Sequence, residues 1–179
     1  SGAYSLSDLA VSFWLYTDTS ESDVSFRVDL ASGETGYDSH AVSWAGLLKR
    51  TLAPQAGVWT RVTLRFSEAV ISDFDWTSLR RLRFMQQGGG EKPAYTLYLD
   101  DIAIIAVNKE ESGLTEGAEI LLLSNADSAP VSMFNATVSS EKSHSGGNSY
   151  RLAPGRGEGA SLWKDFPAPV DLSSEAYET

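Results

Sequence analysis

Two short segments of the sequence alternate aromatic or charged side chains with apolar ones, a pattern that suits sugar binding. Trp14 and Tyr16 alternate with apolar residues in segment 9–16, so they face the opposite side of the strand that this period predicts. Arg27 and Asp29 hold outward positions in the next predicted strand. A sugar ring stacks its C–H bonds on an aromatic ring and forms hydrogen bonds with polar neighbours. We therefore expect these four residues to form the floor of a shallow groove.

Aromatic and amide side chains elsewhere extend this predicted groove. The further candidate ligand-binding residues are Tyr37, Trp44, Gln86 and Trp163. An alternative stays open for every aromatic ring, because large aromatic side chains also fill the space between two sheets. Trp59 and Trp76 are assigned to that core.

The residues that could catalyse a reaction form no recognisable catalytic motif. His40 and His144 are the only histidines, and neither lies in a metalloprotease or serine-hydrolase motif. Asp73 and Asp75 share one side of an extended segment, whereas a glycosidase needs two carboxyl groups roughly 5 to 10 Å apart across a cleft. We therefore expect no enzymatic activity.

The composition excludes several classes of partner. The 179 residues carry a net charge of −10, from 24 acidic and 14 basic residues, which disfavours nucleic acid and anionic membranes. The longest apolar run, residues 102–107, is too short to span a bilayer. No cysteine is present, so neither a disulfide nor a thiolate metal site can stabilise the fold. An oxygen-ligated ion such as calcium remains available for that purpose.

Short β-strands are the elements that must position these residues. Turns rich in glycine and proline separate many of them, which predicts an all-β sandwich or barrel. One short helical piece is expected at residues 75–79, with Asp75 as its cap. The strand-like runs are residues 9–16, 24–30, 40–48, 59–66, 80–86, 95–107, 119–123, 133–138, 149–152 and 160–166.

The chain divides into two segments that look incomplete when taken alone. Residues 109–117 are small and charged, as in a linker, and they separate residues 1–108 from residues 118–179. The last residues of the sequence resemble the lead-in to the first strand. If the second segment is placed before the first, the joined sequence has the strand pattern of one sandwich of about 170 residues, which is an ordinary domain size. We therefore expect strands from both segments to share one sheet and one core.

Three motifs in the two segments occur together in one known kind of domain. Residues 139–152 read S-S-E-K-S-H-S-G-G-N-S-Y-R-L and contain an "HSG, then S-x-R/K-L" hairpin. Residues 57–64 contain a G-x-W-x-x-V strand, and residues 98–102 read Y-L-D-D-I. In these motifs the chain resembles the β-jelly-roll carbohydrate-binding modules of bacterial polysaccharide-degrading enzymes.

The resemblance implies a jelly roll of two antiparallel sheets that binds a polysaccharide, a plant or microbial cell-wall glycan, without catalysis. It also implies an extracellular or cell-surface location in a bacterium. In that family the hairpin comes first and the Y-L-D-D-I-like strand comes last, so the order found here is that of a circular permutation. The alternative is two incomplete halves, completed by neighbouring repeats or by strand exchange between chains.

The resemblance further implies a structural calcium ion near the closing strand. In that family a carboxylate of the closing motif ligates calcium, and Asp100 shares its face of the predicted strand with Tyr98. Calcium takes about six to eight oxygen ligands, so other residues must contribute. The further candidate ligands are Asn125, Asp127 and Glu141. The alternative is that these are solvated turn residues.

Two other functions compete with a carbohydrate-binding module. A structural or adhesive β-sandwich repeat of a bacterial surface protein would have no sugar site. A small jelly-roll glycoside hydrolase or lyase would need an acidic pair in a groove, which the sequence does not reveal. Exposure of Trp14, Tyr16 and Trp44 in a groove, as opposed to burial between sheets, distinguishes the first two functions.

Overall fold

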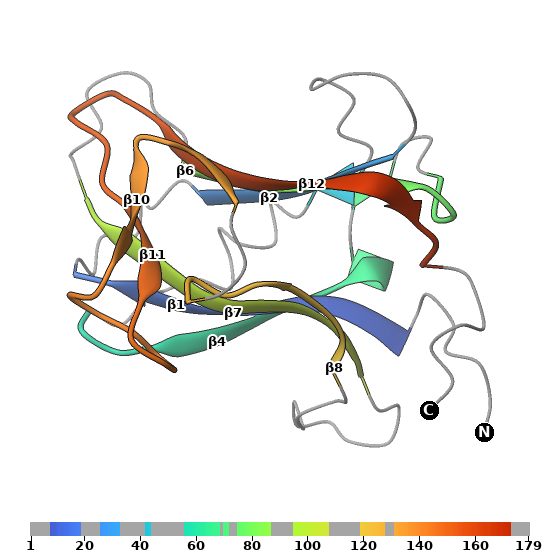
Figure 1. The fold of residues 1–179 in the computed structure, drawn as a ribbon, viewed down its shortest axis with the longest axis horizontal. Coiled ribbons are helices and arrows are strands. Elements are labelled where there is room, and N and C mark those ends of the chain that lie inside the picture. The colour runs from blue at the N-terminus through green and yellow to red at the C-terminus, as the bar shows by residue number, and fades with distance from the viewer. Residues whose placement is uncertain are drawn as a thin grey trace.

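Antiparallel β-strands form most of the described structure, and they pack face to face as two sheets (Figure 1). The structure is a computed structural model. The described residues contain no α-helix, and the expected all-β sandwich of two antiparallel sheets is confirmed. The structure describes residues 8–18, 26–32, 42–43, 56–68, 70–71, 75–86, 95–107, 119–127 and 131–172.

Each sheet combines strands that are far apart in the sequence. Sheet A has the order β10 (Ala136–Ser139), β11 (Ser149–Leu152), β7 (Leu97–Ala106), β1 (Leu9–Thr17) and β4 (Thr60–Arg65), and β8 (Glu119–Ser124) also pairs with β7. Sheet B has the order β5 (Val70–Ile71), β3 (Val42–Ser43), β2 (Phe26–Ser32), β6 (Leu79–Gln86), β12 (Ala160–Val170) and β9 (Ser132–Phe134). One 3₁₀ turn, η2 (Phe66–Glu68), follows β4.

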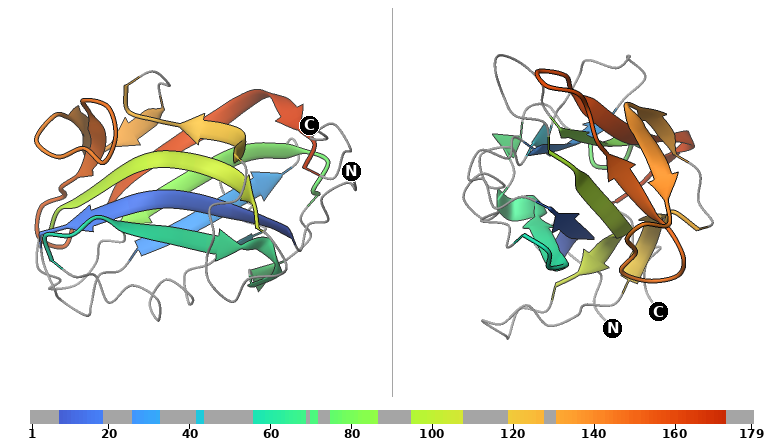
Figure 2. Two further views of the ribbon diagram at one scale, coloured as in Figure 1. Left: turned by 90° about the horizontal axis from the view of Figure 1, so that it is seen from below. Right: turned by 90° about the vertical axis from the view of Figure 1, so that its left-hand side faces the viewer.

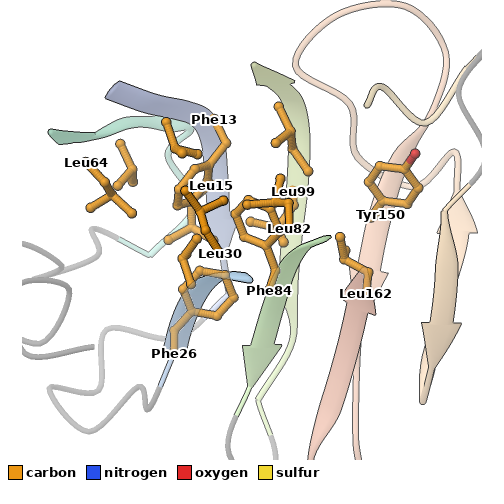
Figure 3. Packing of buried hydrophobic residues seen from close by; sticks show 14 of the residues in the cluster. Phe13, Leu15, Phe26, Leu30, Leu64, Leu82, Phe84, Leu99, Tyr150 and Leu162 are labelled. Atoms are coloured by element: carbon orange, nitrogen blue, oxygen red, sulfur yellow. The ribbon is translucent and has the colours of Figure 1, made fainter. Parts of the chain in front are cut away.

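Alternation along the strands fills the space between the sheets with apolar side chains. Phe13 and Leu15 of β1 are buried, and Phe84 of β6 meets Phe13 edge to face, with the ring centroids 5.0 Å apart. Figure 3 shows these side chains pointing toward one another from both sheets, together with Leu30 and Leu99. Each such burial contributes about 2 kcal/mol to folding, so this core is the main source of stability.

The predicted helix at residues 75–79 is wrong. Asp75 to Ser78 form a turn in which the backbone N–H of Ser78 donates to the carbonyl of Asp75, and β6 begins at Leu79. The Asp75 carboxylate accepts hydrogen bonds from both the backbone N–H and the hydroxyl of Thr77. Asp75 therefore makes the contacts of a helix cap, but the chain continues as a strand, in which Leu79 packs in the main core.

Strands from both segments of the chain lie in both sheets. β11 pairs with β7, and β12 lies between β6 and β9. The main core also combines the two segments, because Tyr150 and Leu162 pack in the same cluster as Phe13 and Leu99. In Figures 1 and 2, β1 begins and β12 ends at the same end of the sandwich, as a circular permutation requires. The permutation itself stays a prediction, and the predicted linker, 109–117, lies outside the described residues.

A second buried cluster lies on the outer face of sheet A. Its residues alternate with residues of the main core along β1 and β7, so they do not form the core of a separate domain. The members of this cluster are Ala10, Ala103, Ile105 and Val107.

Candidate functional site

The predicted groove residues lie on two opposite faces of the sandwich. Trp14 and Tyr16 belong to β1 in sheet A, whereas Arg27 and Asp29 belong to β2 in sheet B. All four alternate with core residues, so they point away from the space between the sheets. The single groove expected from the sequence is therefore not formed, because strands that follow each other in the chain enter different sheets.

The outer face of sheet B brings three predicted residues together. The strand register places Asp29 of β2 opposite Arg83 of β6, and it places Arg83 opposite Trp163 of β12. The same register places Arg81 opposite Asp165. We name this surface the arginine face, and its residues are Arg27, Asp29, Arg81, Arg83, Trp163 and Asp165.

A buried carboxylate organises one part of the arginine face. Asp29 is only 1% exposed, and its two oxygens accept hydrogen bonds from Nε of Arg27 at 2.6 Å and from Nη2 of Arg83 at 3.1 Å. The two arginine side chains are 26% and 18% exposed. One carboxylate thus fixes two guanidinium groups at the surface.

A second ion pair lies against the aromatic ring of the arginine face. Nη2 of Arg81 donates to the Asp165 carboxylate at 2.8 Å, and its Nε donates to the other oxygen of the same carboxylate. The guanidinium carbon of Arg81 lies 5.9 Å from the ring centroid of Trp163, within the range of a cation–π contact. Trp163 is partly exposed, so fixed polar groups surround an accessible ring.

The remaining candidates for the groove do not join this face. Gln86 points into the sandwich, where it is 1% exposed and donates from Nε2 to the carbonyl of Tyr95 at 3.1 Å. The predicted contact between the Gln86 amide and a ligand is therefore wrong for a ligand on the arginine face, because the position of Gln86 in β6 faces the core. Tyr37 and Trp44 lie outside the described residues.

The outer face of sheet A carries a packed group of rings. His144, from the loop that joins β10 to β11, stacks on Trp14 with the ring centroids 3.7 Å apart and the planes inclined by 14°. The ring of Trp59 meets His144 at 5.9 Å and Tyr16 at 5.5 Å, and Tyr98 meets Tyr16 edge to face at 5.8 Å. We name these five residues the aromatic clamp. Its rings contact one another, so the ring face of Trp14 that His144 covers is not available to a ligand.

Two adjacent aspartates of β7 hold the loop of the aromatic clamp in place. Asp100 is fully buried, and its carboxylate accepts backbone hydrogen bonds from His144 at 3.0 Å, Ser145 at 3.1 Å and Asp101 at 2.9 Å. Burial raises the pKa of the Asp100 carboxyl, and these backbone N–H donors oppose that rise. Asp101 has a φ of 49°, at an irregularity in the β1–β7 register. The bulge turns the Asp101 side chain toward the loop.

The Asp101 carboxylate ties two loop side chains together. One oxygen lies 3.1 Å from Nδ1 of His144, and the other accepts a 2.6 Å hydrogen bond from the hydroxyl of Ser145. A nucleophilic serine needs its hydroxyl to donate to the imidazole of a general base. Here the hydroxyl donates to the carboxylate instead, so this trio fixes the loop and does not have the geometry of a hydrolase.

The four predicted calcium ligands make separate contacts. Asp127 accepts from the backbone N–H of Gly147 and the side-chain amide of Asn148, while Glu141 accepts from the hydroxyl of Tyr98 at 2.8 Å. The carbonyl of Asn125 accepts from the hydroxyl of Tyr150. The described ranges contain no group of three or more histidine, cysteine, aspartate or glutamate side chains that could hold a metal ion. A calcium site therefore stays a prediction, because Asp100, Asn125, Asp127 and Glu141 make separate contacts in the described structure.

Sequence reasoning missed three members of the aromatic clamp. The assignment of Trp59 to the core is wrong, because the ring contacts Tyr16 and His144 on the outer face. The alternation of β4 was a usable signal, since Val62 and Leu64 are buried and odd-numbered positions therefore face outward. His144 and Tyr98 had no such signal, because their contacts depend on where a distant loop folds. Trp76 does pack against the core, with its ring 5.0 Å from that of Phe66.

Comparison with known proteins leaves the geometry as the guide to function. Protein-family models, curated proteins and solved structures were compared with the chain, and none matches it. Among the described residues, no helix has the length and apolar character that crossing a membrane would require.

Proposed function

We propose that this chain is a non-catalytic carbohydrate-binding module and that the arginine face is its contact surface for a polysaccharide. The observation that supports the proposal most directly is the row formed by Asp29, Arg83 and Trp163 across three adjacent strands. A partly exposed indole lies beside polar groups that the protein itself holds in place. Sugar-binding sites combine these two elements, because the ring stacks on C–H bonds while polar groups bond the hydroxyls.

Preorganisation favours this surface as a binding site. Asp29 holds Arg27 and Arg83, and Asp165 holds Arg81, before any ligand arrives. A ligand therefore does not have to pay the full entropic cost of ordering long side chains. A shallow sheet face still buries little area, so a modest affinity for each site is expected. Trp44 and Tyr37, outside the described residues, remain candidates for the walls of the same site.

The aromatic clamp supports a different role for the outer face of sheet A. Trp14 and Tyr16 contact His144, Trp59 and Tyr98, and Nζ of Lys142 lies 5.4 Å from the ring centroid of Tyr16. These contacts stabilise the loop between β10 and β11 on the sheet. We therefore assign the clamp to stability and leave glycan binding to the arginine face.

A module of this kind would keep a parent enzyme or a cell close to an insoluble polymer. Tethering raises the effective concentration of a catalytic partner at its substrate without any new chemistry in the module. This role is consistent with the proposed extracellular or cell-surface location in a bacterium.

A structural or adhesive repeat of a surface protein is the second candidate. It is favoured by one observation, namely that the outer-face rings of sheet A pack on the chain's own loop instead of standing free. In such a repeat the ion pairs of the arginine face would only stabilise sheet B. The two candidates differ in whether any glycan binds.

Titration against a panel of plant and microbial polysaccharides tests the proposal. Affinity electrophoresis and calorimetry would compare the unaltered chain with Trp163→Ala, and Trp14→Ala would serve as a matched control on the opposite face. We expect Trp163→Ala to weaken binding at least about tenfold, because about 1.4 kcal/mol of stacking and burial is lost. Trp14→Ala should lower the melting temperature but leave the affinity of the folded protein unchanged. Absence of binding to every glycan would refute the proposal and leave the repeat.

A further inference from the structure

We infer that Phe134 provides a second stacking surface on the outer face of sheet B, so that the proposed site binds a glycan chain and not a single sugar. This inference rests on the proposed function and adds the class of ligand by length. Phe134 is 58% exposed, the highest value among the large apolar residues that the structure describes. Apolar area left in water costs free energy, so an aromatic ring at such a position is a candidate for contact with a ligand.

The strand register places Phe134 on the same face as Trp163. The edge strand β9 pairs with β12 so that Ser132 lies opposite Trp163 and Phe134 lies opposite Ser161. Residues opposite each other in an antiparallel pair point to the same face of the sheet. Leu162 of β12 is buried in the main core, so its neighbours Ser161 and Trp163 point outward. Ser132 and Phe134 of β9 therefore point outward as well.

These outward residues form two similar pairs, each with one aromatic ring and one hydroxyl group. We name them the edge array, and its residues are Ser132, Phe134, Ser161 and Trp163. The two rings are diagonal neighbours, which in an antiparallel pair lie roughly 7 to 8 Å apart. One pyranose ring is smaller than this spacing, so it can stack on only one of the two rings at a time. A glycan chain can cover both rings, and the serine hydroxyl opposite each ring can donate to and accept from the sugar hydroxyls.

Contacts within the chain hold the edge array in place before a ligand binds. Asn135 follows β9 with a φ of 49°, and its Nδ2 donates to the carbonyl of Gly159 at 2.9 Å, one residue before β12 begins. This hydrogen bond ties β9 to β12 at the end of the array that carries Phe134. On the opposite side of β12, the guanidinium carbon of Arg81 lies 5.9 Å from the ring centroid of Trp163. Positions that are fixed in advance reduce the entropy lost on binding.

The test compares two neighbouring residues of β9 that point to opposite faces. Phe134→Ala and Met133→Ala would be titrated with the same panel of polysaccharides as the unaltered chain. Met133 is the matched control, because it is 37% exposed and lies opposite Leu162, on the core side of sheet B. We expect Phe134→Ala to weaken the binding of a polysaccharide about fivefold, since one stacking contact is lost, and Met133→Ala to leave it unchanged. Phe134→Tyr keeps an aromatic ring and should bind like the unaltered chain.

The length of the ligand gives a second readout, which a merely destabilised variant would not imitate. The probes are glucose, xylose, mannose and galacturonic acid, each with its linear oligosaccharides up to the hexasaccharide, and calorimetry measures their affinity. For a series that binds, we expect the affinity of the unaltered chain to rise with the number of sugar units. This rise should be smaller in Phe134→Ala, whereas single sugars should bind both proteins alike.

The outcomes separate this inference from the proposed function. If no polysaccharide binds the unaltered chain, the proposed function fails and the inference fails with it. The inference alone is overturned if Trp163→Ala weakens binding and Phe134→Ala does not, or if a single sugar binds as tightly as its oligosaccharides. An edge strand also offers a surface for pairing between two copies of the chain. Sedimentation equilibrium tests this, and a dimer that Phe134→Ala abolishes while glycan affinity stays unchanged overturns the inference too.

Discussion

Removing the Asp100 carboxylate should destabilise the protein more than most surface changes do. Asp100 is fully buried beneath the loop between β10 and β11 and accepts three backbone hydrogen bonds, from Asp101, His144 and Ser145. In Asp100→Ala these three N–H groups lose their acceptor. A hydrogen bond to a charged group contributes about 1.5 to 3 kcal/mol, and the loop amides can regain water when the loop loosens. We therefore expect a loss of about 3 kcal/mol in the free energy of unfolding.

The loss of stability in Asp100→Asn should depend on pH. Burial raises the pKa of Asp100 in the folded protein, so between its unfolded and folded pKa values the native state binds more protons than the unfolded state. The stability that Asp100 contributes is therefore complete below the unfolded pKa and is lost as the pH rises through the raised folded pKa. Asparagine does not titrate in this range. The stability deficit of Asp100→Asn should consequently widen as the solution is acidified.

Asp75→Asn is a control whose stability deficit should change with pH in the opposite direction. Hydrogen bonds from Thr77 lower the pKa of Asp75, so its contribution is present above the unfolded pKa and is lost as the pH falls through the folded one. Urea unfolding followed by far-ultraviolet circular dichroism at several values from about pH 7 to about pH 4 would measure all three proteins. A deficit of Asp100→Asn that stays constant, or that narrows on acidification, contradicts the argument from burial.

The remaining predictions concern the same loop. Gly146→Ala should cost at least about 2 kcal/mol, because Gly146 has a φ of 63° and an added Cβ would lie 1.9 Å from Oδ2 of Asp127. Gly57→Ala, at a φ of 83° with the nearest atom 3.9 Å away, should cost only about 1 kcal/mol of backbone strain, and equal losses in urea unfolding would disprove the clash. A double-mutant cycle of Trp14→Ala and His144→Ala should give a coupling energy of about 1 kcal/mol from the stacked rings. The pair Trp163→Ala and His144→Ala, on opposite faces, should be additive, and similar coupling in both pairs would show that the stack is not its source.

The inward and outward positions of each strand could be predicted because alternation is a local property. Phe13 and Leu15 were expected on one side of β1, and both are buried in the main core. The outward direction of Trp14 was predicted from the same pattern and agrees with its contact to His144. Each of these assignments needs only the period of two and the type of the residue itself.

The partners of each strand could not be predicted in this way, since pairing depends on contacts between distant segments. The sequence suggested that β1 and β2 lie side by side, yet β1 pairs with β4 and β7, and β2 pairs with β3 and β6. Trp163 and Arg83 are 80 residues apart and meet only through the register of β12 with β6. The arginine face therefore becomes visible only when the sheet is assembled.

Asp29 and Asp100 show how the partner of a buried carboxylate determines what its surface can do. Both are 1% exposed or less, and both lie on an outward position of a strand. Asp100 is held by backbone N–H groups, which are fixed and carry no net charge; burial raises its pKa, and these hydrogen bonds oppose the rise. Asp29 is held by the guanidinium groups of Arg27 and Arg83, which carry formal charges. The first arrangement locks a loop onto sheet A, whereas the second fixes two partly exposed guanidinium groups on the outer face of sheet B, where we propose that the glycan binds.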